Sequence, residues 1–161
     1  MKELYIKAYK LLEDLTPIPA DCGKLCGKRC CKGGKEAGMI LFPGEKELIE
    51  GYYDIQQQEM GDITVDFAVC KGRCNRMNRP LSCRIFPFAP RYQNGILTVH
   101  PDSRARYLCP LLLPQAAEFI DPSFIAAVEE AFRLLLSAEG LDRFLNAYTI
   151  MLDEYKRFTE V

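Results

Sequence analysis

The sequence has little of what marks a hydrolytic enzyme. It contains one histidine, His100, so a histidine-rich metal site or Ser-His-Asp or Cys-His catalysis would depend on that residue. It also lacks a Walker loop, a G-x-S-x-G motif and an H-E-x-x-H motif. His100 lies in a predicted hairpin strand, where it is a fifth metal ligand, a general base, or a side chain that only packs on the hairpin.

Long hydrophobic runs and an excess of one charge are also absent. The longest apolar runs, such as 111–113 and 124–128, are far short of the ~18 residues that cross a bilayer. Residues 1–17 carry charges throughout, which is not typical of a secretory signal. The 21 basic and 22 acidic side chains leave a net charge of −1, so bulk charge indicates no partner. We expect a cytoplasmic chain with no membrane association and no nucleic-acid partner.

The length and composition indicate one globular domain. A chain of 161 residues matches a prior of ~100–200 residues per domain. With 48% hydrophobic and 27% charged residues, the composition excludes disordered and coiled-coil classes. We predict an α+β fold in a single domain, 1–161. It has an irregular cysteine-rich metal-binding core at 16–110 with a few short strands, an N-terminal helix, and a C-terminal helical hairpin at 115–158.

Hydrophobic periodicity and turn residues place the elements of this domain. The predicted helices are 3–15, a short one near 45–51, one that begins at Asp121-Pro122 and ends at Gly140, and one at 141–158. Strands are predicted at 39–42 and 62–69, the latter with alternate residues buried and with Cys70 at its end. Asn94-Gly95 predicts a β-hairpin. We expect the two C-terminal helices to pack over the cysteine-bearing core.

The unusual feature of the sequence is its set of eight cysteines: Cys22, Cys26, Cys30, Cys31, Cys70, Cys74, Cys83 and Cys109. The first four fall within ten residues, and a three-residue gap recurs between Cys70 and Cys74. A C-x₂₋₄-C pair can place two thiolates on one metal ion. Four cysteines in ten residues are not a core pattern. We therefore favour metal ligation over packed thiols and over a disulfide framework, which is rare in a reducing cytosol.

The spacing leaves the assignment of ligands open. Eight cysteines make two four-thiolate sites, or one such site plus spare thiols. The adjacent Cys30 and Cys31 tend to point apart, so they serve two different sites, or one is a ligand and the other packs. Cys83 and Cys109 have no local partner. As ligands, they must fold back onto the cysteines at 22–31 or 70–74.

Charge patterning supports thiolate chemistry. Five bases and no acid lie between Asp21 and Glu36, and six bases and no acid lie between Asp66 and Asp102. Cationic neighbours lower thiol pKa values and favour the thiolates that metals need. Two Zn(Cys)₄ sites would carry about −4 formally, so several cations are in surplus. These surplus cations are solvated surface or a groove for a protein or acidic small-molecule partner.

The motifs also resemble those of a known family. Cys22-x₃-Cys26-x₃-Cys30-Cys31, then Cys70-x₃-Cys74, then the segment RPLSCRIFP at 79–87, resemble the YkgJ-like cysteine-cluster family. Proteins of that family are thought to chelate zinc or iron. The resemblance covers about residues 22–110 and leaves out the helical tail. It implies a metal-binding module whose ligands are drawn from the eight cysteines.

Three functions follow as hypotheses. The first is a metal-binding protein that holds zinc or iron by thiolates and has no assigned reaction. The second is an iron–sulfur redox or methyl-transfer-related enzyme with a [4Fe–4S] cluster, because flagellin lysine methylases carry a related cysteine cluster. No glycine-rich cofactor loop occurs here, so methyl transfer itself does not carry over. The third is a thiol-based interaction protein without metal.

Overall fold

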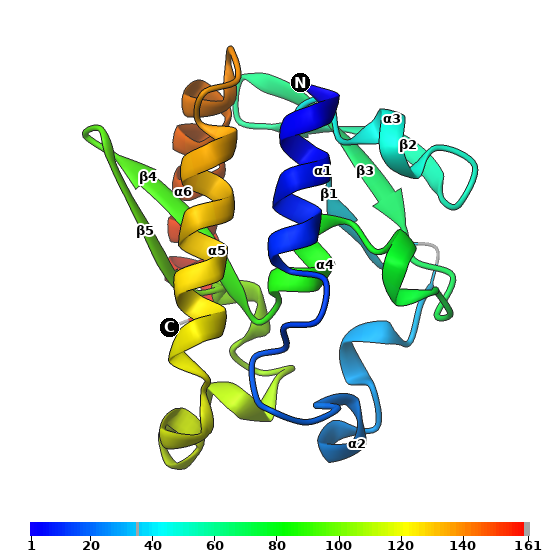
Figure 1. Cartoon of the computed structure of the whole chain (residues 1–161), viewed down its shortest axis with the longest axis vertical. Coiled ribbons are helices and arrows are strands. Elements are labelled where there is room, and N and C mark those ends of the chain that lie inside the picture. The colour runs from blue at the N-terminus through cyan, green and yellow to red at the C-terminus, as the bar shows by residue number, and fades with distance from the viewer. Residues whose placement is uncertain (35, 160–161) are drawn as a thin grey trace.

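The computed structural model describes residues 1–34 and 36–159, and it combines helices with antiparallel strands in the predicted α+β class (Figure 1). The helices are α1 (Lys2–Leu11), α2 (Gly23–Cys26), α3 (Lys46–Ile49), α4 (Leu81–Ile85), α5 (Pro122–Leu135) and α6 (Leu141–Thr159). The strands are β1 (Gly38–Ile40), β2 (Asp54–Met60), β3 (Ile63–Val69), β4 (Phe88–Gln93) and β5 (Ile96–Pro101). Short 3₁₀ turns lie at Arg29–Cys31, Arg76–Asn78, Ser103–Ala105, Pro110–Leu112 and Pro114–Phe119.

The strands form two separate antiparallel sheets. In the first, β3 lies between β1 and β2, and Val69 pairs with Gly38 on one side and with Asp54 on the other. The chain therefore leaves β3 at Cys70 directly beside the start of β1. The second sheet is the ribbon β4–β5, whose turn residues Asn94 and Gly95 both have positive φ, of 53° and 78°. This is the backbone that an Asn-Gly hairpin predicts.

The apolar core is centred on Phe42, which follows β1. Its ring makes edge-on contacts with Phe132 at 4.7 Å, Phe144 at 5.7 Å and Tyr148 at 5.8 Å between centroids. Phe132 belongs to α5, and the other two belong to α6. Such aromatic pairs stabilise a core beyond the area that they bury. Phe42 therefore ties the end of the first sheet to both C-terminal helices.

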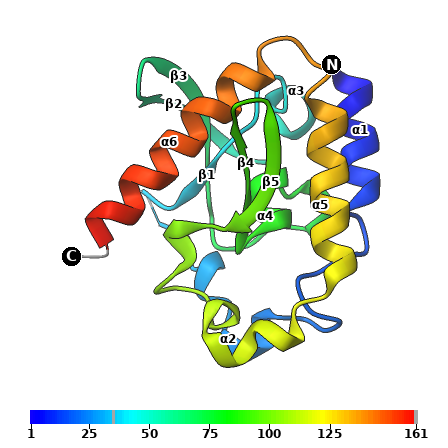
Figure 2. The same ribbon diagram turned by 90° about the vertical axis from the view of Figure 1, so that its left-hand side faces the viewer.

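The two C-terminal helices begin and end as the sequence predicts. Asp121 caps α5 by accepting a hydrogen bond from the Ser123 amide, and Gly140, with φ of 79°, separates α5 from α6. Both helices pack on strands of the predicted 16–110 core, as expected, but they do not lie side by side as a helical hairpin. Helix α5 lies beside α1, α6 lies along β4, and the two diverge around the β4–β5 ribbon (Figure 2). Near the end of α6, Tyr155 is exposed.

Three local expectations need correction. Helix α1 ends at Leu11 rather than near residue 15. Strand β2 was not predicted, because its polar sequence DIQQQEM forms an exposed strand at the sheet edge with no apolar alternation. Ala68 was expected on the polar face of β3, yet it is buried against Leu41 and Ile49, because α3 covers that face. Strand β3 is thus covered on both faces near Cys70.

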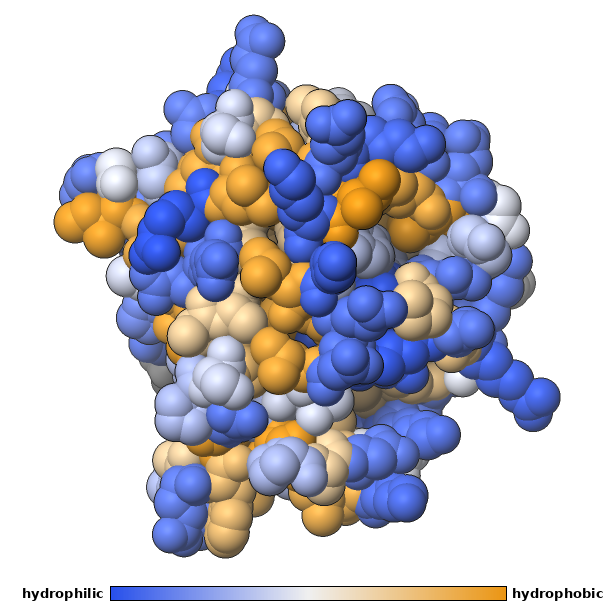
Figure 3. Space-filling view, in the orientation of Figure 1, coloured by the Kyte–Doolittle hydropathy of each residue, from blue (hydrophilic) through white to orange (hydrophobic). Residues whose placement is uncertain are grey.

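The surface in the orientation of Figure 1 is mixed rather than uniformly apolar. Figure 3 shows hydrophobic residues along the seam where α1 and α5 pack and in further groups on either side of it, with hydrophilic residues between them. No described helix combines the length and the hydrophobicity needed to cross a membrane.

Candidate metal centre

All eight cysteines line one cavity of about 410 Å³. They reach it from five places: the region of α2, the turn Arg29–Cys31, the loop after β3, helix α4, and the start of the turn Pro110–Leu112. The structure therefore brings Cys83 and Cys109 to the same cavity as the clustered cysteines, as their isolation in sequence required. Among the described residues, none from α5 or α6 contributes to the cavity wall.

The first four cysteines follow a tight, exposed path. Cys22 is the N-terminal flanking residue of α2, and the Cys26 Sγ lies 3.9 Å from the Cys22 carbonyl oxygen one turn later. Gly27 and Lys28 then both adopt left-handed backbone, which reverses the chain into the next turn. That turn brings the Sγ atoms of Cys30 and Cys31 to 3.8 Å from each other. The pair does not point apart as adjacency suggested.

Two glycines allow the first cluster to touch the second. The Gly34 amide donates to the Cys70 carbonyl at 3.3 Å, and the Cys70 amide donates to the Ala37 carbonyl at 2.7 Å. Gly33 and Gly72 meet at this contact, both with positive φ, and a Cβ on Gly33 would lie 2.6 Å from the Gly72 nitrogen. Only glycine fits such an approach without displacing backbone. The loops that carry Cys31 and Cys70 are thus held in direct contact.

The segment RPLSCRIFP organises the opposite wall. Arg79 Nε donates to the Cys74 Sγ at 3.2 Å, and the Arg79 carbonyl in turn accepts from Arg84 Nε at 2.9 Å. Arg84 is only 3% exposed, donates also to the Met77 carbonyl, and stacks over the Tyr9 ring. Arg79 therefore hydrogen-bonds a thiol sulfur directly. Arg84 instead is buried and organises the backbone between Cys74 and Cys83.

Sequence reasoning missed the carboxylate that holds α4 in place. Glu45 is fully buried, and its Oε1 accepts from the Leu81 amide and the Tyr9 hydroxyl, each at 2.6 Å. Its Oε2 accepts from the Phe42 amide at 3.0 Å. Leu81 is the first residue of α4, so Glu45 fixes the helix that carries Cys83. The only sequence signal was its place just after Pro43-Gly44, where an acid at a helix start is ordinary.

The thiols influence one another's protonation. A hydrogen bond from Cys30 lowers the pKa of Cys31 to about 6, and Arg79 and Lys28 also lower it, while the pKa of Cys30 is raised by that same bond. Burial raises the pKa of Cys83, and the thiolates of Cys74, Cys31 and Cys70 raise it further. Burial also raises the pKa of Cys109, with contributions from Cys22 and Cys26. A cation bound by these thiols in their ionised form would remove the repulsion that raises their pKa values.

The polar groups around the thiols are mostly cationic. The described cavity wall has one acid, Glu36, and six bases: Arg29, Lys32, Arg76, Arg79, Arg84 and Arg104. Arg76 donates to the Glu13 and Leu15 carbonyls, and Arg104 binds Asp102 and Tyr148. These two arginines therefore have structural partners, whereas Arg29 and Lys32 are exposed. Positive charge on the wall favours ionised thiols inside it.

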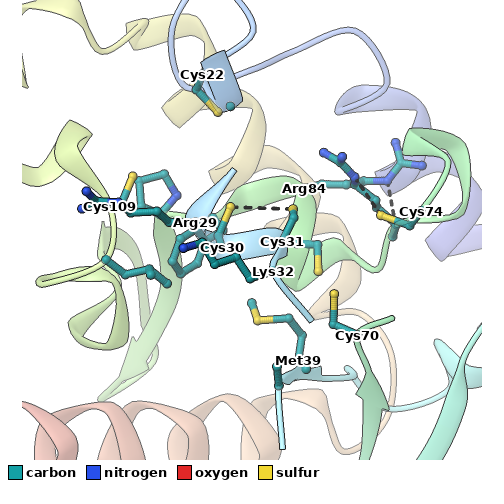
Figure 4. Close-up of a pocket in the computed structure, with 18 of the residues that line it drawn as sticks. Cys22, Arg29, Cys30, Cys31, Lys32, Met39, Cys70, Cys74, Arg84 and Cys109 are labelled. Atoms are coloured by element: carbon teal, nitrogen blue, oxygen red, sulfur yellow. Dashed lines mark hydrogen bonds between the residues drawn. The ribbon is translucent and has the colours of Figure 1, made fainter. Parts of the chain in front are cut away.

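The cysteine side chains that line the cavity are of the type that binds zinc or iron, but their sulfurs do not converge on one point. Within 1–34 and 36–159, no three His, Cys, Asp or Glu side chains are close enough together to hold an ion as they stand. All eight thiols are free, and seven are half-buried along a single cavity. Burial raises the pKa of Tyr53, on the same wall, and its contact with Cys74 raises it further. Figure 4 shows Cys30 and Cys31 between Cys22 and Cys109 on one side and Cys70 and Cys74 on the other.

His100 is not part of this arrangement. It lies on β5 with an exposed side chain, and it is not among the described residues that line the cavity. The structure therefore places it on the surface of the hairpin, away from the thiols.

Comparison of the chain with protein-family models, curated proteins and solved structures finds no match. The resemblance to the YkgJ-like cysteine-cluster family stays a prediction based on the motifs alone. The functional argument therefore depends on the cavity and its residues.

Proposed function

We propose that this chain is a metal-binding protein that holds zinc or iron through the thiolates of the cavity. One observation carries the proposal: eight cysteines from five separated places in the chain line the same cavity. Thiolates are the ligands that zinc and iron–sulfur clusters take from proteins. A packing role for the cysteines would instead distribute them through the apolar core, which is formed by other residues.

The surroundings of the thiols support ligation. Arg79 donates to the Cys74 sulfur, which is the kind of outer-shell contact that orients a ligand and compensates its charge. Other cations on the wall offset part of the formal charge of about −2 that each four-thiolate zinc site carries. The cavity is therefore electrostatically suited to an anionic metal–thiolate centre.

The local energetics point the same way. No residue from Pro19 to Gly34 is buried, so this stretch gains almost nothing from hydrophobic burial. Structural zinc contributes apparent binding energies of ~10–16 kcal/mol in small peptides, enough to order a segment of this length. Ligation by the cysteines within it would supply the stabilisation that burial does not.

Elemental analysis of the purified protein tests the proposal. The protein is prepared anaerobically in parallel from zinc- and iron-supplemented cultures, and bound metal per chain is measured by mass spectrometry. We expect stoichiometric metal in the native protein and none after alkylation of the thiols in denaturant followed by refolding with metal. Metal-free native protein with all eight thiols reactive would refute metal binding and favour the thiol-based interaction protein.

A [4Fe–4S] cluster is the second candidate, with a redox or methyl-transfer-related activity. The observation that favours it is the Arg79 contact, because hydrogen bonds to cluster-ligating sulfurs tune reduction potential. A brown protein with absorption near 400 nm after anaerobic purification would support the cluster. Colourless protein with bound zinc would support the first candidate.

The exposed bases beside the cavity suggest the class of any further partner. Lys24, Lys28, Arg29 and Lys32 are exposed along the first cysteine cluster. A protein with an acidic surface, or an acidic small molecule, is the partner that this surface would attract. Free thiols at all eight positions also fit a reducing compartment, and we propose the cytoplasm.

A further inference from the structure

The cysteine cavity meets solvent at one short stretch of the chain. Of the described residues that line it, only four are exposed: Arg29, Cys30, Lys32 and Glu36. These four form the entrance of the cavity, since the other described lining residues are buried or half-buried. Cys30 is also the one exposed cysteine of the eight, so its sulfur is the first that a solute reaches.

The backbone at the entrance places two cations beside that sulfur. Arg29 begins the 3₁₀ turn that contains Cys30, and Lys32 follows the turn with helical backbone. Side chains three residues apart in such a turn lie above one another, so Arg29 and Lys32 share a face. The Lys32 carbonyl is packed against the loop after β3, where a Cβ on Gly72 would lie 3.0 Å from its oxygen. Figure 4 shows both bases beside Cys30.

The chain does not neutralise these two bases. None of the ion pairs between described residues involves Arg29, Lys32 or the entrance acid Glu36. Deeper on the wall the situation differs, because Arg76 donates to backbone carbonyls and Arg104 pairs with Asp102. The positive charge that is free to act on a solute therefore lies at the entrance.

This charge decides in which form a metal can approach. A hydrated divalent cation has the same sign as the two bases, whereas a dication held by several carboxylates of a small molecule forms a complex of net negative charge. Charge of one sign at a cleft raises the association rate of an oppositely charged solute by roughly 10–10³. The cavity, of about 410 Å³, also lies in the ~300–1,000 Å³ range of small-molecule sites.

We propose that the metal arrives as an anionic carboxylate complex of low molecular weight, which Arg29 and Lys32 attract to the entrance and from which Cys30 takes the metal first. This inference rests on the proposed function. The transfer is a ligand exchange without oxidation or reduction. A metal–oxygen bond breaks as a metal–sulfur bond forms, and the proton of the thiol passes to the released carboxylate or to water. Zinc favours thiolates over carboxylates, so the exchange runs toward the protein.

Cobalt(II) loading of reduced protein under anaerobic conditions tests the proposal, with the rise of the sulfur-to-cobalt absorption followed by stopped flow. The two metal donors are the anionic cobalt nitrilotriacetate complex and hydrated cobalt(II). Arg29→Gln/Lys32→Gln should load roughly three- to tenfold more slowly from the anionic donor at low salt, and no more slowly from the hydrated ion. The difference should disappear at ~1 M salt, where charges are screened within ~3 Å.

Two further variants act as controls. Lys7→Gln/Lys10→Gln removes the same charge from exposed positions three residues apart on α1, and Arg29→Lys/Lys32→Arg keeps the charge at the entrance. Both should load at the wild-type rate from either donor, and all variants should reach the wild-type cobalt content, because every cysteine is kept.

Equal slowing from both donors in Arg29→Gln/Lys32→Gln would show that the bases act on the thiols and not on the incoming anion. Equal slowing in the α1 variant would show that only net charge matters. Either result, or an unchanged rate from the anionic donor, overturns the entry route while metal binding stands. A wild-type protein that binds cobalt from neither donor overturns the proposed function itself.

Discussion

Replacing Glu45 by glutamine tests whether a buried carboxylate holds α4, the helix that carries Cys83, in place. The amide has nearly the same shape, and it can keep the acceptor that serves the Tyr9 hydroxyl and the Leu81 amide. It then presents an NH₂ group to the Phe42 amide, which loses its acceptor. The variant therefore leaves one buried donor unsatisfied at the junction of the core and α4.

The magnitude follows from that single lost bond. Losing a charged acceptor from a buried donor costs about 1.5–3 kcal/mol, and removing a buried charge offsets a part, so we expect about 2 kcal/mol. For a chain of this size, each kcal/mol moves the midpoint by about 2–4 °C, so Tm should fall by roughly 4–8 °C. Glu47→Gln is the matched control, because Glu47 is exposed on α3, the helix that Glu45 directly precedes. Its effect should stay within about 0.5 kcal/mol.

The pH dependence of this difference gives a second readout. Burial raises the pKa of Glu45 above its unfolded value, although the hydrogen bonds from Tyr9, Leu81 and Phe42 oppose the shift. The stabilisation from this group is complete below its unfolded pKa of ~4.3 and is lost as the pH rises through the folded pKa.

Urea unfolding at several pH values should therefore show the largest gap between wild type and Glu45→Gln under acidic conditions. A gap that widens with pH, or a variant as stable as Glu47→Gln at every pH, would refute the role given to Glu45.

Three further predictions concern the cavity. Arg79→Gln should weaken metal binding by roughly ten- to hundredfold in a chelator competition, because Arg79 hydrogen-bonds the Cys74 sulfur. Arg73→Gln, at an exposed position, should change the affinity little, and equal effects of the two variants would show that only net charge matters. Gly33→Ala should lower metal affinity more than Gly27→Ala. Both glycines have positive φ, but of the two only Gly33 lies against the backbone of another loop, at Gly72. Equal losses of affinity would mean that this loop contact is dispensable. Chelation should speed hydrogen exchange at 19–34 and 70–87. Helices α5 and α6 should stay protected, because their apolar faces are buried in the core and do not line the cavity. Unchanged exchange everywhere would contradict ligation by the cysteines.

The parts of the fold that sequence predicts are those set by neighbouring residues. Asn94-Gly95 specifies its own turn, and Asp121 caps a helix through the amide two residues away. The apolar alternation in β3 similarly places Cys70 at a strand end. Each feature depends on contacts within a few residues, so periodicity and turn chemistry were sufficient.

The parts that sequence did not predict depend on long-range pairing. Strand β2 forms on the edge of β3 by backbone hydrogen bonds, which its polar side chains do not signal. Glu45 and Arg84 carry charges that normally stay in water, and only their distant partners explain their burial. The convergence of Cys83 and Cys109 on one cavity was required by the metal hypothesis, but which thiols each would approach was not readable from spacing.

The cysteine segments differ in where their order comes from. Cys70 leaves a strand covered on both faces, and Cys83 lies on a helix that begins at an amide held by Glu45. The apolar core therefore positions these two thiols. The first four cysteines lie in the largely exposed stretch that turns back through the left-handed Gly27 and Lys28. A non-glycine residue in that conformation is strained unless its surroundings hold it. Because burial does not hold this stretch, ligation of its thiols is the stabilisation that the proposed function would supply.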